Sequence, residues 1–226
     1  MSWNLQATPY KRVERAQLIF DRIFRANLPD VLLLQEVNRD VRKAILADPK
    51  LRGGFLMSDA DSEDDSAFFP FSTMTLLSRK RFAAGGVSSG EDQLQKMVIS
   101  DAFRMTLPSR DDRDALCIDV SDPVTPGHVL RLINVHLESL DAAFRRGFQL
   151  YLMNALLREA GCSGGVIAGS FNAFEPYDLT LVEQHGLLDA WVKLHGPLPR
   201  ADVGHWRRPR RRPPAGPPRQ GRDAWP

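Results

Sequence analysis

The sequence contains little cysteine and no long hydrophobic run. Only Cys117 and Cys162 occur among 226 residues, and Cys117 lies in an apolar, strand-like run, so we expect a buried free thiol and not a disulfide. Sparse cysteine favours a reducing, intracellular compartment, either nucleus or cytoplasm. No apolar run approaches the roughly 20 residues that a membrane-spanning helix needs. The polar start at 1–6 does not read as a secretory signal, so we expect no membrane partner.

A basic folded body is also lacking. The formal net charge is +2, but the stretch from Ala201 onward holds seven arginines and two aspartates, about +5, which leaves about −3 for residues 1–200. Net charge therefore gives no reason to expect nucleic-acid binding by the body. We predict a domain over 1–200 and a disordered Arg/Pro-rich tail over 201–226. A tail that binds nucleic acid, a solvated tail, and a departure of the reading frame near Ala201 stay open as interpretations.

Residues 1–195 alternate between helical and strand-like patterns. Apolar residues at helical spacing predict helices over 11–27 and 141–160, and Asn38 is a suitable cap for a helix over 38–47. Strands are predicted at 31–34, 74–78, 115–120, 129–135 and 165–168, and shorter elements at 178–184 and 188–194. A turn with proline and glycine at 122–127 favours an antiparallel hairpin. The pattern indicates an α/β protein with a mixed sheet.

Four short segments stand in order along this pattern. They are Ser2-Trp3-Asn4, Leu34-Gln35-Glu36-Val37, Asn134-Val135-His136-Leu137-Glu138-Ser139 and Gly169-Ser170-Phe171-Asn172. Together they resemble the endonuclease/exonuclease/phosphatase superfamily of metal-dependent phosphodiesterases, most closely its tyrosyl-DNA phosphodiesterase 2-like branch. The resemblance covers residues 2–195. It implies two mixed β-sheets packed face to face with helices on both outer faces, a four-layer α/β/β/α sandwich.

The chain departs from the family pattern at two points. The fourth segment reads Gly-Asp-x-Asn in the family, whereas position 170 is serine here. The Arg-x-Asp and Ser-Asp-His segments that follow in the family are absent. We therefore expect a degenerate, C-terminally truncated relative whose sandwich is incomplete at its C-terminal end.

The resemblance implies a metal site. Phosphodiester hydrolysis needs a hard cation on the phosphate oxygens, a positioned water, and donors for the developing charge. Glu36 is expected to hold Mg²⁺ or Mn²⁺, because magnesium prefers oxygen ligands and needs only one or two carboxylates. Asn4 is expected to help orient the metal or the phosphate. Taken alone, Glu36 would read as a surface glutamate at a strand end.

Three further residues receive roles from the resemblance. His136 is expected to contact the phosphate and stabilise the transition state, with a buried structural histidine as the alternative. Asn172 is expected to orient a water or a phosphate oxygen. Arg113 is expected to reach the phosphate, with a surface salt bridge as the alternative.

Ser170 replaces a residue that helps to activate water in the family. A serine hydroxyl carries no negative charge at neutral pH without an activating base of its own. Loss of a general base lowers the rate by about 10²–10⁴-fold. No Gly-x-Ser-x-Gly segment surrounds Ser170, so a nucleophilic serine is not favoured. We expect activity that is weak or lost.

Three functions follow from the sequence. The first is a Mg²⁺-dependent phosphodiesterase acting on a nucleic-acid 5′ end or on a phosphotyrosyl link in a protein–DNA adduct, working as a monomer. The second is a catalytically inactive, truncated family member. The third is a nucleic-acid-binding module that acts through its basic tail.

Overall fold

The computed structural model describes residues 1–25, 28–60, 72–85 and 96–196, which divide into a unit Met1–Leu187 and a unit from Leu188 onward. The first unit holds two β-sheets. The four-stranded sheet has the order β1 (Ser2–Asn4), β2 (Val31–Gln35), β4 (Met74–Ser78) and β3 (Phe55–Met57). The five-stranded sheet has the order β5 (Phe82–Ala84), β6 (Met97–Thr106), β7 (Asp114–Ser121), β8 (Val129–His136) and β9 (Cys162–Ser170).

Both sheets are mixed, and their parallel pairs place the sequence motifs. β1 runs parallel to β2, with Asn4 beside Gln35. β8 runs parallel to β9, with His136 beside Ser170. The β2–β4, β3–β4, β6–β7 and β7–β8 pairs are antiparallel. Because parallel strands end at the same edge, each sheet presents two motif segments at one edge.

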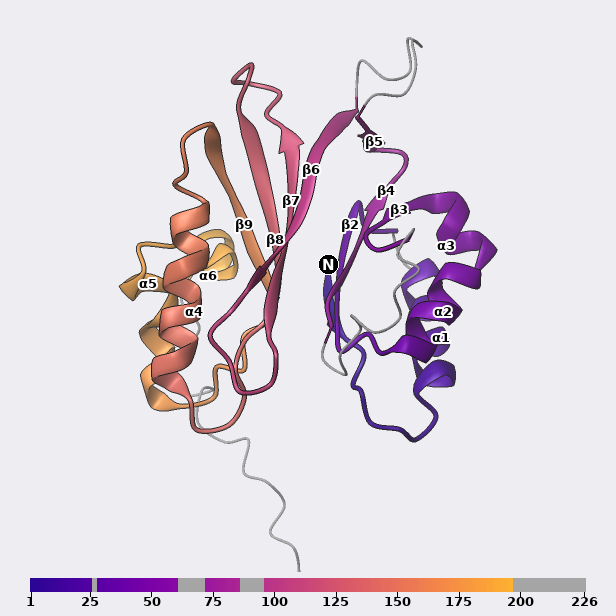
Figure 1. Ribbon diagram of the computed structural model, residues 1–226, viewed down its shortest axis with the longest axis horizontal. Coiled ribbons are helices and arrows are strands. Elements are labelled where there is room, and N and C mark those ends of the chain that lie inside the picture. Colours follow the sequence, from indigo (N-terminus) through magenta and orange to yellow (C-terminus); the bar gives the residue numbers. More distant parts are fainter. Residues whose placement is uncertain (26–27, 61–71, 86–95, 197–226) are drawn as a thin grey trace, which may run out of the picture. The chain divides into compact units, whose positions relative to one another are not determined.

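Helices cover the outer face of each sheet. In the first unit, α1 (Arg12–Arg25), α2 (Arg39–Ala47) and α3 (Pro49–Gly54) lie over the four-stranded sheet (Figure 1). α4 (Ala143–Leu156) lies over the five-stranded sheet (Figure 1), and α5 (Leu181–Gln184), which follows the 3₁₀ helix η3 (Pro176–Thr180), packs in the same apolar cluster through Leu181. The predicted four-layer α/β/β/α sandwich is confirmed.

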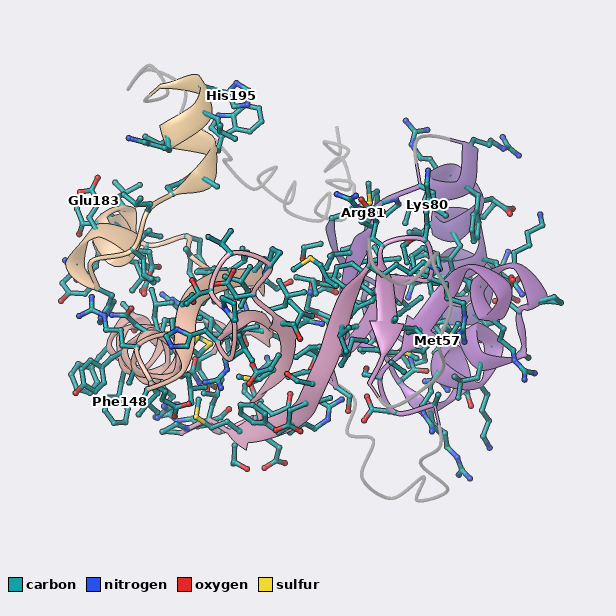
Figure 2. The ribbon with its side chains drawn as sticks, turned by 90° about the horizontal axis from the view of Figure 1, so that it is seen from above. Met57, Lys80, Arg81, Phe148, Glu183 and His195 are labelled. Carbon is teal, nitrogen blue, oxygen red and sulfur yellow. The ribbon has the colours of Figure 1, made fainter. Side chains whose placement is uncertain are left out.

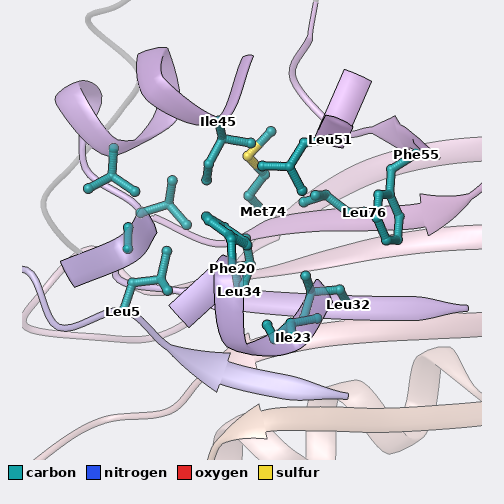
Figure 3. Packing of buried hydrophobic residues seen from close by; sticks show 13 residues of the cluster. Leu5, Phe20, Ile23, Leu32, Leu34, Ile45, Leu51, Phe55, Met74 and Leu76 are labelled. Carbon is teal, nitrogen blue, oxygen red and sulfur yellow. The ribbon is translucent and has the colours of Figure 1, made fainter. Parts of the chain in front are cut away.

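The largest apolar cluster lies between α1–α3 and their sheet (Figure 3). Phe20 and Ile23 come from the apolar face of α1, and Leu32 and Leu34 alternate toward them from β2. All four side chains are at most 5% exposed. Alternation along β2 sends Leu33 and Gln35 to the other face, toward the second sheet.

A buried polar residue joins the two sheets near the motif end. Asn134 in β8 is 0% exposed, and its Nδ2 donates to Leu34 O at 3.1 Å and Met74 O at 3.0 Å. Its Oδ1 accepts from Gln35 Nε2 at 2.8 Å. Buried polar groups must be paired, so these bonds fix the register between the sheets. An apolar cluster of Leu77, Phe82, Ile118 and Val120 is packed elsewhere in the unit.

Local sequence signals are confirmed at several elements. The side chain of Asn38 caps α2 by accepting from Asp40 N and Val41 N, both at 3.1 Å. β4 has the predicted bounds, and β7 and β8 form the predicted antiparallel hairpin. The helix predicted over 11–27 is found as α1, with residues 26–27 outside the described part.

Other predictions need correction. The helix predicted over 141–160 extends only from Ala143 to Leu156, because turns occupy the residues before Gly161, which has a φ of +84°. The single helix predicted over 178–184 is a 3₁₀ helix followed by one α-helical turn. The predicted tail over 201–226 lies outside the described residues.

The outer surface of the first unit carries exposed aromatic and basic side chains. Phe148 extends from α4 into solvent (Figure 2) and stacks on Tyr151 with ring centroids 6.2 Å apart. Lys80 and Arg81 are exposed in the turn between β4 and β5 (Figure 2). In the described ranges, no helix combines the length and apolar character needed to cross a bilayer.

The second unit contains one described helix, α6 (Ala190–His195). Asp189 caps it by accepting from Val192 N at 3.1 Å, and the rings of Trp191 and His195 lie 4.2 Å apart. This helix matches the short element predicted over 188–194.

Candidate active site

Strand ends from both sheets bring five of the predicted site residues into one connected group. Asn4 ends β1, Glu36 follows β2, His136 ends β8 and Ser170 ends β9. Arg113 directly precedes β7. The parallel pairings place these ends together. Hydrogen bonds join Asn4 to Glu36 and to Ser170, and Arg113 to His136, and the two sets meet where His136 Nε2 lies 3.8 Å from Glu36 Oε1.

Glu36 is held by donors on both carboxylate oxygens. Its Oε1 accepts from Asn4 Nδ2 at 2.8 Å, and its Oε2 accepts from the backbone N–H of Ala7 at 2.5 Å. The backbone of Glu36 has a φ of +57°, in the left-handed region. A residue other than glycine adopts this conformation at a cost of about 1–3 kcal/mol, and such strain is concentrated at functional sites.

Ser170 is connected to the same group through amide side chains. Asn4 Nδ2 donates to Ser170 Oγ at 3.2 Å, and Ser170 Oγ donates to Gln35 Oε1 at 3.3 Å. Neither partner is a base that could remove the hydroxyl proton. Neither contact therefore activates the Ser170 hydroxyl as a base would.

His136 is oriented by a buried arginine. Arg113 is 2% exposed, so it does not lie on the surface, and its Nη1 is 2.7 Å from His136 Nδ1. Because a guanidinium only donates, Nδ1 must accept and the imidazole proton sits on Nε2. His136 Nε2 lies 3.8 Å from Glu36 Oε1.

The same surroundings keep His136 neutral. Burial and the neighbouring charge of Arg113 lower the pKa of His136 to about 4, against a smaller opposing effect of Glu36. Burial also lowers the pKa of Arg113, whose side chain lies 3.6 Å from Asp111. At neutral pH the site thus presents a neutral imidazole with an N–H directed toward Glu36.

Asn172 lies in the loop after β9, with a φ of +50°. Its Nδ2 donates to Leu137 O at 2.7 Å, which ties this loop to the segment that follows β8. Its contact with a water or a phosphate oxygen stays a prediction.

A model of the Endonuclease/Exonuclease/phosphatase family matches residues 1–223. The chain belongs to this family. Its members are hydrolases that act on phosphodiester bonds and generally depend on a divalent metal. No curated protein matches the sequence.

Several solved structures have the same fold. D. rerio TDP2 complexed with single-strand DNA product has a TM-score of 0.61 and 21% identity, over 87% of this chain and 69% of that one. The human Nocturnin catalytic domain has a TM-score of 0.54 and 18% identity, over 85% and 71%. ANGEL2, a 2′,3′-cyclic phosphatase, has a TM-score of 0.52 and 16% identity, over 80% and 56%. At these identities the likeness shows the fold alone.

The donor set fits the hard cation that the family uses. Among the described residues no three His, Cys, Asp or Glu side chains converge, so a zinc-type ligand set is not formed there. Glu36 supplies one carboxylate, and the oxygens of Ser170 and Gln35 are linked to it through Asn4. Magnesium needs one or two carboxylates and keeps several waters, so Glu36 fits Mg²⁺ or Mn²⁺.

Sequence reasoning gave no role to several residues that shape the site. Glu138 is 3% exposed and accepts from Ser109 Oγ at 2.8 Å and Arg110 N at 3.2 Å, which anchors the loop before Arg113. Gln35 and Glu138 lie inside the four short segments, so their position in the sequence could have indicated a role at the site. The contact of the Ala7 amide could not be predicted from the sequence, because any residue type offers the same backbone N–H.

Proposed function

We propose that this chain is a Mg²⁺-dependent phosphodiesterase of the tyrosyl-DNA phosphodiesterase 2 type, with reduced turnover. Its substrate would be a DNA 5′ end, including a phosphotyrosyl link to protein. The observation that carries the proposal is the gathering of Asn4, Glu36, Ser170, His136 and Arg113 at one end of both sheets, with His136 Nε2 3.8 Å from Glu36 Oε1. The TDP2 complex with a single-strand DNA product, which shares the fold, supports this substrate class.

Each residue has a defined task in this proposal. Glu36 would hold the cation, and Asn4 orients Glu36 by donating to Oε1. The cation would neutralise charge on the phosphate oxygens and lower the pKa of the attacking water. His136 would donate its Nε2–H to a phosphate oxygen, and its lowered pKa keeps the ring a neutral donor across the physiological range.

Arg113 serves His136 in two ways. Its bond to Nδ1 fixes the tautomer that leaves the proton on Nε2. Its positive charge, buried beside the site, favours the binding of an anionic phosphate.

Ser170 limits the rate in this proposal. Since neither of its partners is a base, the step that an aspartate would assist goes without help, and the rate falls by about 10²–10⁴-fold. The same observation favours a second candidate function, a family member without turnover.

The test is hydrolysis of a 5′-phosphotyrosyl DNA oligonucleotide with Mg²⁺ by the unmodified chain, Glu36→Gln and Ser170→Asp. Slow cleavage that Glu36→Gln abolishes and Ser170→Asp accelerates is expected. Cleavage by Ser170→Asp alone would favour the second candidate. Silence from all three would refute hydrolysis of a phosphotyrosyl link to DNA.

A role of the basic tail is tested separately. Loss of salt-sensitive DNA binding on removal of residues 201–226 would favour the binding module predicted from the sequence. A nucleic-acid partner, a monomeric state and an intracellular location in nucleus or cytoplasm stay predictions.

A further inference from the structure

One side chain binds carbonyl groups along the loop between β1 and α1, residues 5–11. Arg15 in α1 donates from Nε to Leu5 O at 3.2 Å and from Nη1 to Tyr10 O at 2.8 Å. Its Nη2 donates to Gln6 O and, at 3.3 Å, to Thr8 O. A single guanidinium thus binds four carbonyl groups spread over six residues.

The other hydrogen bonds of this loop involve the N–H groups of residues 5–7 and the carbonyl of Lys11. Leu5 is buried at 1% exposure, but Thr8, Pro9 and Tyr10 are all exposed. Gln6 has a φ of +61°, a conformation that costs free energy in any residue other than glycine. Arg15 lies in the first turn and a half of α1, where a cation gains nothing from the helix dipole. The loop carbonyls are therefore the interactions that account for its placement.

The same loop reaches the candidate active site. The N–H of Ala7 donates to Glu36 Oε2 at 2.5 Å, and the N–H of Gln6 donates to Asn4 Oδ1 at 2.8 Å. Both donors lie between the carbonyls that Arg15 binds. Their direction is therefore set by the conformation that Arg15 imposes on the loop.

We propose that Arg15 is a positioning residue for the metal site: it fixes the 5–11 loop so that Ala7 N–H and Asn4 hold Glu36 in one orientation. The inference rests on the proposed role of Glu36 as the cation ligand. A carboxylate with a donor on each oxygen keeps a single rotamer, so its remaining lone pairs point in fixed directions. When Arg15 is lost, the loop opens, Glu36 gains freedom, and the cation binds a less organised site. Removal of groups that orient a metal ligand lowers metal affinity by about 10–100-fold.

The experiment uses the full chain and two readouts. The first is amide hydrogen exchange of the 5–11 segment in EDTA, and the second is Mn²⁺ affinity from electron paramagnetic resonance. The variants are Arg15→Gln, Arg15→Lys and Glu36→Gln. Arg22→Gln is the matched control, since Arg22 is exposed on the same helix and its loss changes the net charge equally.

Arg15→Gln should speed exchange at Ala7 and weaken Mn²⁺ binding by about tenfold or more, while Arg22→Gln changes neither. Arg15→Lys keeps the charge but cannot bind four carbonyls, so its exchange rate and Mn²⁺ affinity should lie between those of Arg15→Gln and Arg22→Gln. It also serves as the folded variant if Arg15→Gln unfolds below the assay temperature. If Arg15→Gln binds Mn²⁺ as the unmodified chain does while Glu36→Gln loses affinity, this inference alone is overturned. Arg15 would then stabilise the loop without affecting the metal site. Equal binding by Glu36→Gln and the unmodified chain would overturn the proposed metal site and this inference with it.

Discussion

The replacement Ser170→Asp restores the residue that the family carries and brings a second carboxylate into the site. Asn4 Nδ2 lies 2.8 Å from Glu36 Oε1 and 3.2 Å from Ser170 Oγ, so these two oxygens are no farther apart than 2.8 plus 3.2, or about 6 Å. An aspartate at position 170 would therefore face the charge of Glu36 at about this distance or less.

The size of the effect follows from that distance. Two unit charges about 6 Å apart repel by about 3 kcal/mol at an effective dielectric constant of about 20. Without metal, Ser170→Asp should be less stable than the neutral control Ser170→Asn by about this amount. For a chain of this size the difference corresponds to a melting temperature about 6–12 °C lower.

A divalent cation should reverse this order. It neutralises the repulsion, so Mg²⁺ should raise the melting temperature of Ser170→Asp more than that of Ser170→Asn. If the aspartate also assists the attacking water, phosphodiester cleavage should rise by about 10²–10⁴-fold.

Thermal unfolding in EDTA and in millimolar Mg²⁺ measures both effects. Equal melting temperatures of the two variants in EDTA would refute the proximity of positions 36 and 170. An equal Mg²⁺ response of both variants would refute a cation that both carboxylates share.

Three further predictions concern stability and reactivity. In EDTA, lowering the pH from 7.5 to 5 should reduce the free energy of unfolding of the unmodified chain by about 2 kcal/mol more than that of His136→Asn. The pKa of His136 is about 4 in the folded chain and about 6.5 in the unfolded chain, so only the unfolded chain takes up the proton in this range. This stability is present above pH 6.5 and is lost as the pH falls toward 4; urea unfolding at both pH values measures it, and equal losses would argue against a neutral buried imidazole. Asn134→Ala should lower the free energy of unfolding in urea by about 2–4 kcal/mol, because two buried backbone carbonyls lose Asn134 as a donor, while Gln35 Nε2 keeps Ser2 Oγ and Leu33 O as acceptors. A loss below about 1 kcal/mol would contradict the bridge between the sheets. Burial raises the pKa of Cys117 to about 12, so iodoacetamide at pH 8 should label only Cys162 in the folded chain, and mass spectrometry that finds two labels would disprove a buried Cys117.

The sequence predicted those elements whose signals are local. α2 has a side-chain cap at Asn38, and β4 is a compact apolar run, so both were found close to their bounds. α3 was not predicted, although Asp48 is a suitable cap for it. In the structure Asp48 follows the last residue of α2 and caps α3 by accepting from Lys50 N at 2.8 Å. β6 was missed because Ser100 and Asp101 interrupt its apolar alternation where the ladder with β7 is irregular.

The candidate site was predictable in composition but not in geometry. The motifs identified Asn4, Glu36, His136 and Ser170, since each stands at a strand end within a recognisable segment. The bond from Arg113 to His136 and the amide of Ala7 on Glu36 depend on loops that other parts of the chain position. Those contacts follow from tertiary placement, which residue types and spacing do not encode.

The hydrogen bond between Asn4 and Ser170 spans 166 positions of the chain. During synthesis the N-terminal strand leaves the ribosome first, and at about 5–20 residues per second its partner follows roughly 10–30 s later. Within that interval, once β4 has emerged, a nascent chain can form the four-stranded sheet and its covering helices, yet it still lacks Ser170. Ser170 therefore joins Asn4, Glu36 and His136 only after β9 has been made, so a chain that stops before β9 lacks the bond that ties the first strand to the last.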